Sequence, residues 1–345
     1  MSFMKKTIAL VLTAAILTAS VFSGCSGSGS SANSGTKSVG STGTAAVDWP
    51  KKSVSLTVPA SAGGGTDVQV RLLATAWNKS ISNPSVVTNY DSIAVGIQTV
   101  SDAKNDGYTL LTTHSGFFCN YITGTLDVNP LTDLTTIACM NDMGTQCLIA
   151  STKAPYNTFT EMVEYSKSHQ VTAAVSTNGA SQFMMDLVQQ ETGAKFNYKE
   201  SGTETEKLTN LAGGFIDVGV CTLDHAISYE KAGKVKVLGS FCADGKHVDE
   251  SLGNSFKSFQ DMGYKNIFWG TYMLVMGPKD MDPNLVEAIN ASLKGVVNDS
   301  DYKTGIEKQG GTVQWMSVKD SQAEVKKEFE TIVKLAKASN CYVQG

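Results

Sequence analysis

Hydrophobic and polar residues alternate strictly along residues 53–58. The apolar positions are Val54, Leu56 and Val58, and the polar positions between them are Ser55 and Thr57. This period of two is typical of a half-buried β-strand. Pro59 ends the strand because it has no N–H to donate. From Thr66 the apolar period becomes that of a helix, so residues 53–77 are expected to form a strand, a loop and a helix.

The loop in this unit, residues 60–65, consists of small residues and ends in three successive glycines. A loop of this kind that runs into a helix leaves backbone N–H groups pointing outward, and the helix dipole favours negative charge there. No Gly-Lys-Ser/Thr follows and no G-x-G-x-x-G is formed, which excludes a Walker loop and a dinucleotide fingerprint. The pattern predicts a site for another anion, with an unliganded strand–helix connection as the alternative.

The same pattern recurs further along the chain. Residues 171–175 form an apolar run, residues 176–181 a small polar loop, and residues 182–192 a helical pattern that Gly193 ends. Two such loops facing each other would surround a ligand with backbone N–H groups and hydroxyls, which are donors suited to the oxygens of a carboxylate. We predict this arrangement, with a simple turn as the alternative for the second loop.

Short apolar runs alternate with helical patterns from about residue 48 to the C-terminus. The runs include residues 109–113, 146–151, 171–175, 216–221 and 235–241. The alternation predicts an α/β protein with mainly parallel sheets, and the length fits two domains. The hydrophobic content of 41% and the net charge of −4 are ordinary for a globular protein and give no basic footprint for nucleic acid.

The N-terminus has the pattern of an export signal. Lys5 and Lys6 precede an apolar run over residues 8–22, and small residues lead to Cys25 in a sequence that resembles a bacterial lipobox. We interpret residues 1–24 as a lipoprotein signal peptide and Cys25 as the lipidated residue. The alternative is an uncleaved membrane anchor, for which the run is short. Residues 25–47 are typical of a flexible Ser/Gly-rich tether, and either interpretation places the remainder outside the cytoplasmic membrane, at its outer face or in the periplasm.

Other segments supply further candidates for the same cleft. His114 and Ser115 follow the run 109–113, Thr222 follows the run 216–221, and Trp269 precedes another apolar run at 272–276. His114 is as easily a plain surface residue, and Trp269 as easily a core residue. Asp67 suits a helix N-terminus, and we expect it to organise the first loop rather than to touch an anion, because two carboxylates repel each other.

Several short segments resemble one family in their order and spacing. They are Trp49-Pro50, Val58-Pro59, Gly63-Gly64-Gly65-Thr66-Asp67, Asp106-Gly107-Tyr108-Thr109-Leu110, Leu211-Ala212-Gly213-Gly214, Ile216-Asp217 and Lys231-Ala232-Gly233-Lys234. Over nearly all of the chain after the tether, the sequence is similar to the substrate-binding proteins of the tripartite tricarboxylate transporter family, also called Bug receptors. It departs from the commonest members at Ala62, at residues 201–204 and at Cys221-Thr222. The side-chain pocket is therefore expected to differ from theirs.

The resemblance implies a type II periplasmic-binding-protein fold, in which two α/β domains close over a ligand in the cleft between them. We expect residues 48–153 and 272–345 to form domain I and residues 154–271 to form domain II. In this family the two loops hold the carboxylates of the ligand. The expected ligand-binding residues are Ala60, Ser61, Gly64, Gly65, Thr66, Asp67, His114, Ser115, Ser176, Thr177, Asn178, Gly179, Ser181, Gln182, Thr222 and Trp269.

The resemblance also implies a monomeric receptor that binds a small di- or tricarboxylate, without cofactor or metal, and delivers it to the membrane permease subunits of a tripartite tricarboxylate transporter. A carboxylate sensor that feeds a two-component signalling system is the alternative, because it needs the same receptor. An enzyme is disfavoured, since no G-x-S-x-G or H-E-x-x-H motif occurs and the four histidines are scattered.

Cysteines other than Cys25 raise the question of disulfides. They are Cys119, Cys139, Cys147, Cys221, Cys242 and Cys341. An exported protein could pair them, whereas several lie in apolar strand runs, where a buried reduced thiol is as common. If one pair forms, we expect it to join Cys221 and Cys242, because each ends one of two successive strands.

Overall fold

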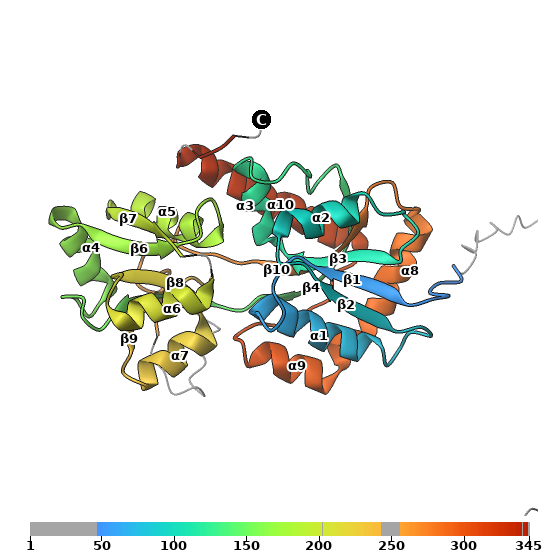
Figure 1. Ribbon diagram of the computed structural model, residues 1–345, viewed down its shortest axis with the longest axis horizontal. Helices are drawn as coiled ribbons and strands as arrows, with labels where there is room; N and C mark the ends of the chain where they lie inside the picture. The colour runs from blue at the N-terminus through green and yellow to red at the C-terminus, as the bar shows by residue number, and fades with distance from the viewer. Residues whose placement is uncertain (1–46, 202, 243–255, 340, 344–345) are drawn as a thin grey trace, which may run out of the picture. The chain divides into compact units, whose positions relative to one another are not determined.

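A computed structural model of the protein describes residues 47–201, 203–242, 256–339 and 341–343 (Figure 1). The predicted signal peptide, Cys25 and the tether up to residue 46 lie outside the described residues. The described residues form two α/β domains, each built around a five-stranded sheet. No helix among them is long and apolar enough to cross a membrane.

The sheet of the first domain has the strand order β2-β1-β3-β10-β4. Its strands are β1 (Val54–Val58), β2 (Ser85–Asn89), β3 (Thr109–His114), β4 (Leu134–Asp142) and β10 (Tyr272–Pro278). β1 pairs in parallel with β2 and β3, whereas β10 pairs antiparallel with β3 and β4. The helices of this domain are α1 (Gly65–Trp77), α2 (Ile93–Ser101), η1 (Ser115–Phe117), α3 (Phe118–Ile122), α8 (Pro283–Leu293), η3 (Lys294–Asn298), α9 (Ser300–Glu307) and α10 (Val318–Ala338).

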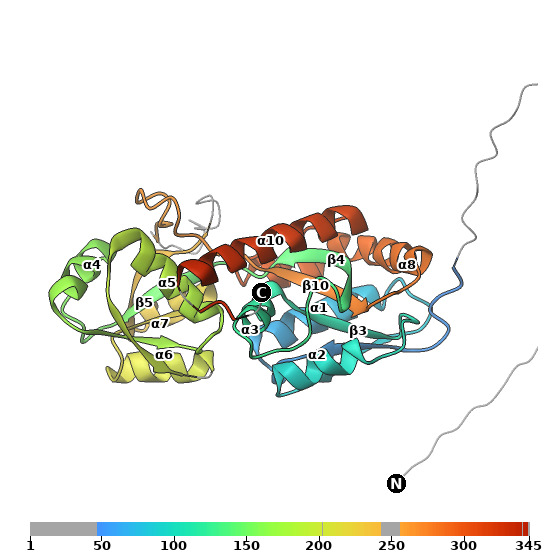
Figure 2. The same cartoon turned by 90° about the horizontal axis from the view of Figure 1, so that it is seen from above.

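Two helical layers cover the two faces of this sheet. The alternating apolar residues of β1 are fully buried in one core with Trp77 of α1 and Ile289 of α8. On the other face Leu111 of β3 and Met276 of β10 are buried in a second core with α2, α3 and α10. Figure 2 shows the long α10 extending towards α5 of the other domain, where Gln190 Nε2 donates a hydrogen bond to Ser339 Oγ at 2.8 Å.

The sheet of the second domain has the strand order β7-β6-β8-β5-β9. Its strands are β5 (Gln146–Ser151), β6 (Val171–Val175), β7 (Phe196–Glu200), β8 (Val218–Thr222) and β9 (Val235–Ser240). The helices of this domain are α4 (Phe159–Ser168), α5 (Ala180–Thr192), α6 (Glu204–Gly213) and α7 (Leu223–Lys231). β6 pairs in parallel with β7 and β8, whereas β5 pairs antiparallel with β8 and β9.

Two expectations about the sheets need correction. β5 belongs to the second sheet, so the chain leaves the first sheet between Asp142 and Gln146, before the boundary expected at residue 153. Each sheet also contains one interior strand, β10 in the first and β5 in the second, that runs antiparallel to both of its neighbours. These are the strands by which the chain enters one domain from the other, and they make the sheets mixed rather than mainly parallel.

Cys221 and Cys242 form no disulfide, and the alternative of buried reduced thiols describes them instead. Strand β5 lies between β8 and β9, and it is Cys147 of β5 that pairs across strands with Cys221. Successive strands in the sequence are therefore not neighbours in this sheet, which removes the basis for the predicted pair. All six described cysteines are free thiols, and burial raises the pKa of Cys147 and of Cys221 above the ordinary thiol value.

Candidate ligand-binding site

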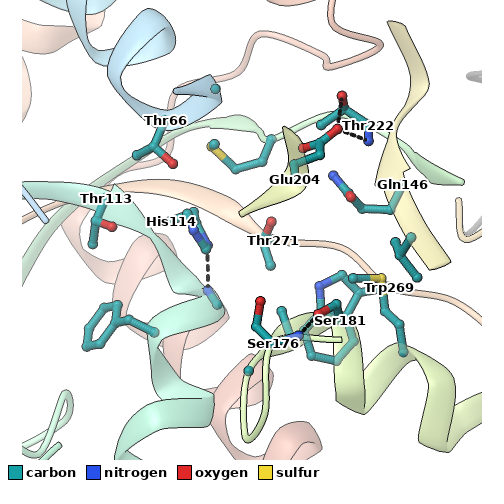
Figure 3. A pocket seen from close by; sticks show the side chains of 18 of the residues that line it. Thr66, Thr113, His114, Gln146, Ser176, Ser181, Glu204, Thr222, Trp269 and Thr271 are labelled. Carbon is teal, nitrogen blue, oxygen red and sulfur yellow. Dashed lines mark hydrogen bonds between the residues drawn. The ribbon is translucent and has the colours of Figure 1, made fainter. Parts of the chain in front are cut away.

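A cavity of ≈ 360 Å³ is lined by residues of both domains at the carboxyl ends of β1, β3, β6 and β8. Ligands of α/β proteins commonly bind at this edge of a sheet, because loops and helix N-termini converge there. Figure 3 shows Thr66 and His114 on one side of the cavity and Glu204 and Trp269 on the other. Both loops selected from the sequence therefore reach one cavity.

The structure divides the expected ligand-binding residues into two groups. Those on the cavity wall are Gly65, Thr66, His114, Ser176, Thr177, Gly179, Ser181, Thr222 and Trp269. Those that do not line it are Ala60, Ser61, Gly64, Asp67, Ser115, Asn178 and Gln182. Members of the second group support the loops instead: Gln182 Oε1, for example, accepts a hydrogen bond from the N–H of Asn178 at 2.9 Å. Ser115 is buried behind His114, where its hydroxyl contacts Glu328 of α10.

Asp67 fixes the shape of the first glycine loop. Its carboxylate accepts hydrogen bonds from Gly63 N–H (2.8 Å), Arg71 Nε (2.8 Å) and Asn89 Nδ2 (2.9 Å). Burial opposes ionisation, but the bond from Arg71 and the other donors outweigh it and hold the pKa of Asp67 below its ordinary value. Since Asp67 is 1% exposed and lies off the cavity wall, its position suits a loop organiser rather than a ligand contact.

Replacing Asp67 by Ala is expected to weaken ligand binding about 10-fold, because three donors lose their acceptor and the loop N–H groups lose their alignment. The protein should stay folded, since the loop lies at the edge of the first domain. Calorimetric titration measures the affinity, and thermal unfolding verifies that the variant is folded. Asp261→Ala, at an exposed position away from the cavity, is the matched control. Unchanged affinity in Asp67→Ala would remove the organising role.

Gly65 opens α1 on the cavity wall, and a Cβ atom placed there meets nothing within 4 Å. A larger side chain is therefore compatible with the fold but projects into the cavity. Gly65→Val is expected to abolish ligand binding while changing Tm of the free protein by less than about 2 °C. Gly295→Val, where a Cβ also meets nothing within 4 Å, is the control for the substitution itself. Normal binding by Gly65→Val would show that the ligand lies elsewhere.

His114 contributes a neutral donor at the end of β3. Its Nδ1 accepts a hydrogen bond from the N–H of Gly116 at 3.1 Å, so the ring proton is on Nε2. Burial lowers the pKa of His114 to about 4. The side chain therefore offers an N–H donor without a positive charge at neutral pH, so the first-domain side of the cavity presents the N-terminus of α1 and neutral donors.

The second loop holds a hydroxyl donor backed by a buried cation. Ser181 Oγ accepts hydrogen bonds from Ser176 N–H at 2.8 Å and from Lys207 Nζ at 3.1 Å. Both acceptor positions of this oxygen are used, so the O–H of Ser181 is left to donate into the cavity that it lines. Lys207 also donates to Ser176 Oγ at 3.0 Å and is only 7% exposed. Its positive charge therefore lies directly beneath the loop and the N-terminus of α5.

Glu204, the first residue of α6, places a negative charge in the same wall. Its Oε1 accepts hydrogen bonds from the N–H and the hydroxyl of Thr222, each at 2.9 Å, and from His225 Nδ1 at 2.7 Å. Burial raises the pKa of Glu204, but the bonds from His225 and Thr222 outweigh it and hold the pKa below its ordinary value. The hydrogen bond to Glu204 in turn raises the pKa of His225.

Trp269 and Thr271 lie on the segment that leads from the second domain to β10, and both line the cavity. The indole of Trp269 is half-buried and packs against cores of both domains. Its backbone N–H donates to the carbonyl of Phe241 at 2.8 Å. Cleft wall and core were the two alternatives for Trp269, and it serves as both.

Sequence reasoning missed several polar residues of the cavity wall. They are Gln69, Thr113, Asn120, Gln146, Glu204, Lys207, Thr271 and Gln309. Glu204 and Lys207 had a usable signal, because α6 begins directly after the carboxyl end of β7, at the sheet edge where ligands bind. Gln69 and Gln309 had no such signal in the sequence. Their side chains meet only in the folded protein, where Gln69 Nε2 donates a 3.0 Å hydrogen bond to Gln309 Oε1.

Comparison with known proteins supports this reading of the fold. The structure is similar to the periplasmic binding protein BugD, with a TM-score of 0.73, 22% identity and coverage of 86% of this chain and 100% of that chain. It is also similar to MatC from Rhodopseudomonas palustris, solved with bound malate, with a TM-score of 0.72, 20% identity and coverage of 83% and 99%. A third similar structure is Rpa4515 of R. palustris with adipate, with a TM-score of 0.75, 20% identity and coverage of 85% and 99%. The type II periplasmic-binding-protein fold expected from the resemblance is confirmed.

Sequence comparison identifies the family. Protein BugT of Bordetella pertussis is 24% identical over 279 residues, which are 78% of this chain and 83% of BugT. A sequence model of the tripartite tricarboxylate transporter family receptor matches residues 69–340, which is most of the chain. The protein therefore belongs to the tripartite tricarboxylate transporter family of receptors.

Proposed function

We propose that the protein is an extracytoplasmic, lipid-anchored receptor that binds a small di- or tricarboxylate between its two domains and delivers it to the membrane subunits of a tripartite tricarboxylate transporter. The observation that carries the proposal is that the N-termini of α1 and α5, one from each domain, line a single cavity together with Lys207. Helix N-termini and a buried cation both favour anions. The malate and the adipate in the two R. palustris proteins are small dicarboxylates, which is consistent with this ligand class.

The expected contacts differ between the domains. On the first domain, the N–H groups at the start of α1, Thr66 and the Nε2–H of His114 would hold one carboxylate. On the second domain, the hydroxyl of Ser181 and the start of α5, with Lys207 behind them, would hold another. Closure of the domains is stabilised only by contacts that the ligand makes better in the closed state. The protein then acts by binding and docking, as a monomer and without covalent chemistry.

The anchor and the partners follow from the N-terminal pattern and from the family. Cys25 is proposed to carry the lipid and residues 25–47 to tether the body at the outer face of the cytoplasmic membrane. The domains are proposed to comprise residues 48–142 with 272–345, and residues 146–271, as the strands divide between the sheets. The closed, liganded surface of both domains would dock on the permease subunits.

Thermal unfolding against a panel of carboxylates and their neutral amides tests the proposal. A ligand that binds only the folded protein raises Tm in a concentration-dependent way. We expect at least one small di- or tricarboxylate to raise Tm by several degrees, about 2.7 kcal/mol of stabilisation at a concentration of 100 Kd. Its amide should raise Tm by little. If no carboxylate shifts Tm of protein shown by mass spectrometry to be free of carried-over ligand, the proposed function is wrong.

A further inference from the structure

Glu204 is a negatively charged group in a cavity that is proposed to take carboxylates. Its side chain is 32% exposed and lines the cavity (Figure 3). Among the described residues, Thr222 and His225 donate hydrogen bonds to Glu204, and all of these bonds are to Oε1. The second oxygen, Oε2, therefore keeps its lone pairs for a group that enters the cavity.

A ligand carboxylate placed against Glu204 would meet a like charge, and such repulsion is costly where water is partly excluded. His225 reduces this charge only when it is protonated. Even then the pair is neutral and Oε2 remains an acceptor, so this end of the cavity favours a donor group over a second carboxylate. An ammonium group suits this position, because it donates hydrogen bonds and carries the charge opposite to that of Glu204.

The positive charge of the cavity lies close to this position. Lys207 follows Glu204 by three residues in the first turn of α6, so the two side chains leave the same side of the helix. They are the charged side chains of the described cavity wall, because His114 is neutral. The second domain thus presents an acceptor with negative charge beside a donor with positive charge. A ligand that matches both carries an ammonium and a carboxylate on neighbouring atoms.

We infer, on the basis of the proposed function, that the ligand is an amino dicarboxylate. Its ammonium meets Glu204 Oε2, its neighbouring carboxylate meets Ser181 and the start of α5 above Lys207, and its second carboxylate meets the N-terminus of α1. Glu204 is then a specificity-determining residue. It selects for an amino group at the carbon beside the carboxylate and against a third carboxylate in that place.

Two matched sets of acids test the inference by calorimetric titration of the purified protein. L-Aspartate, L-malate and succinate share a four-carbon skeleton and differ only in the group at the second carbon. L-Glutamate, L-2-hydroxyglutarate and glutarate form the corresponding five-carbon set. In at least one set the amino acid is expected to bind about 10-fold or more tightly than the unsubstituted acid, with the hydroxy acid between them.

A variant then assigns the preference to its residue. Glu204→Gln keeps the acceptor for Thr222 and His225 but removes the charge, and it is expected to reduce the preference for the amino acid to less than about 3-fold. Glu206→Gln is the matched control, because Glu206 is exposed in the same helical turn and does not line the cavity. Thermal unfolding of the free variants verifies that both are folded.

Three results would overturn the inference. The first is equal binding of the amino and the unsubstituted acids by the wild-type protein, which leaves the proposed carboxylate receptor intact. The second is a preference that persists unchanged in Glu204→Gln, which removes Glu204 as its source. The third is that neither amino acid binds at all. The proposed function falls with the inference only if the wider carboxylate panel also fails to raise Tm.

Discussion

Replacing Lys207 by Met is expected to weaken the binding of any carboxylate ligand about 100-fold, or about 2.7 kcal/mol. Lys207 is 7% exposed, and its ammonium donates to the hydroxyl oxygens of Ser176 and Ser181. The Met side chain has a similar length but no charge and no donor. Ser181 Oγ then keeps only the bond from the Ser176 N–H, so its own O–H is no longer directed into the cavity. The ligand loses both the field of the cation and an aligned hydroxyl.

The free protein should tolerate this substitution. Burial lowers the pKa of Lys207, which means that keeping its charge inside the protein costs free energy that Met does not cost. Tm of the unliganded variant is therefore expected to fall by no more than about 2 °C, or to rise. Lys199→Met is the control, because Lys199 is exposed on the neighbouring β7 and lies off the cavity wall. Wild-type affinity in Lys207→Met would show that the second loop does not hold the ligand's carboxylate.

Local patterns in the sequence were enough to locate the two loops of the cavity. The alternation of Val54, Leu56 and Val58 and the change of period at Thr66 each depend on neighbours within a few residues. The observed β1 and α1 follow these patterns closely, and so does the unit formed by β6 and α5. A helix N-terminus is positioned by the loop that precedes it, so its chemistry can be predicted together with the loop.

Pairing between distant segments was not predictable in the same way. The apolar run at 146–151 was recognised as a strand, but nothing within it shows which sheet it joins. Its place depends on hydrogen bonds to β8 and β9, which lie far along the chain. The boundary expected at residue 153 placed this run in the first domain, and the suggested pair of Cys221 with Cys242 took successive strands to be neighbours; both depended on a sheet position that the run itself does not show.

The charges of the cavity wall depend on tertiary contacts as well. Glu204 reaches the cavity because its carboxylate is held by Thr222 at the end of β8 and by His225 of α7. Lys207 is buried because the loop of Ser176 and Ser181, from another strand, lies over it. In the sequence alone, a Glu and a Lys in a helical pattern are typical of the solvent-exposed face of a helix. The family resemblance pointed to the two loops but supplied neither residue, and Glu204 lies in a segment, 201–204, where this chain departs from the common pattern.

Replacing Glu328 by Gln is expected to stabilise the protein by about 2 kcal/mol at pH 7 and to raise Tm by roughly 4 °C. Glu328 lies on α10, where Oε1 accepts a hydrogen bond from Ser115 Oγ and Oε2 is buried without a partner among the described residues. The pKa of Glu328 is raised from 4.5 to about 8, chiefly by burial; the hydrogen bond from Ser115 opposes the rise, and the nearby Glu324 adds to it. At pH 7 the side chain is therefore protonated in the folded protein but ionised in the unfolded chain.

The sign of the pH dependence follows from this raised pKa of Glu328. Between about pH 4.5 and about pH 8 the folded protein holds a proton that the unfolded chain has released, so the stability contributed by this group falls as pH rises. Gln does not titrate, so the difference between the variant and the wild-type protein should be close to zero near pH 4.5. It should grow by at most about 1.4 kcal/mol for each pH unit up to about pH 8.

Thermal unfolding of both proteins from pH 4.5 to pH 9 measures this difference directly. Glu330→Gln, at an exposed position on the same helix, should show no comparable growth with pH. A gain that is constant across the range, or absent at pH 8, would contradict a raised pKa for Glu328. Glu328 also bears on the cavity through its partner Ser115. Ser115 Oγ accepts a hydrogen bond from the N–H of Tyr272, at the start of β10, where the chain re-enters the first sheet. A protonated Glu328 holds Ser115 behind His114 without adding a second negative charge near the cavity. An ionised Glu328 would instead repel an anionic ligand.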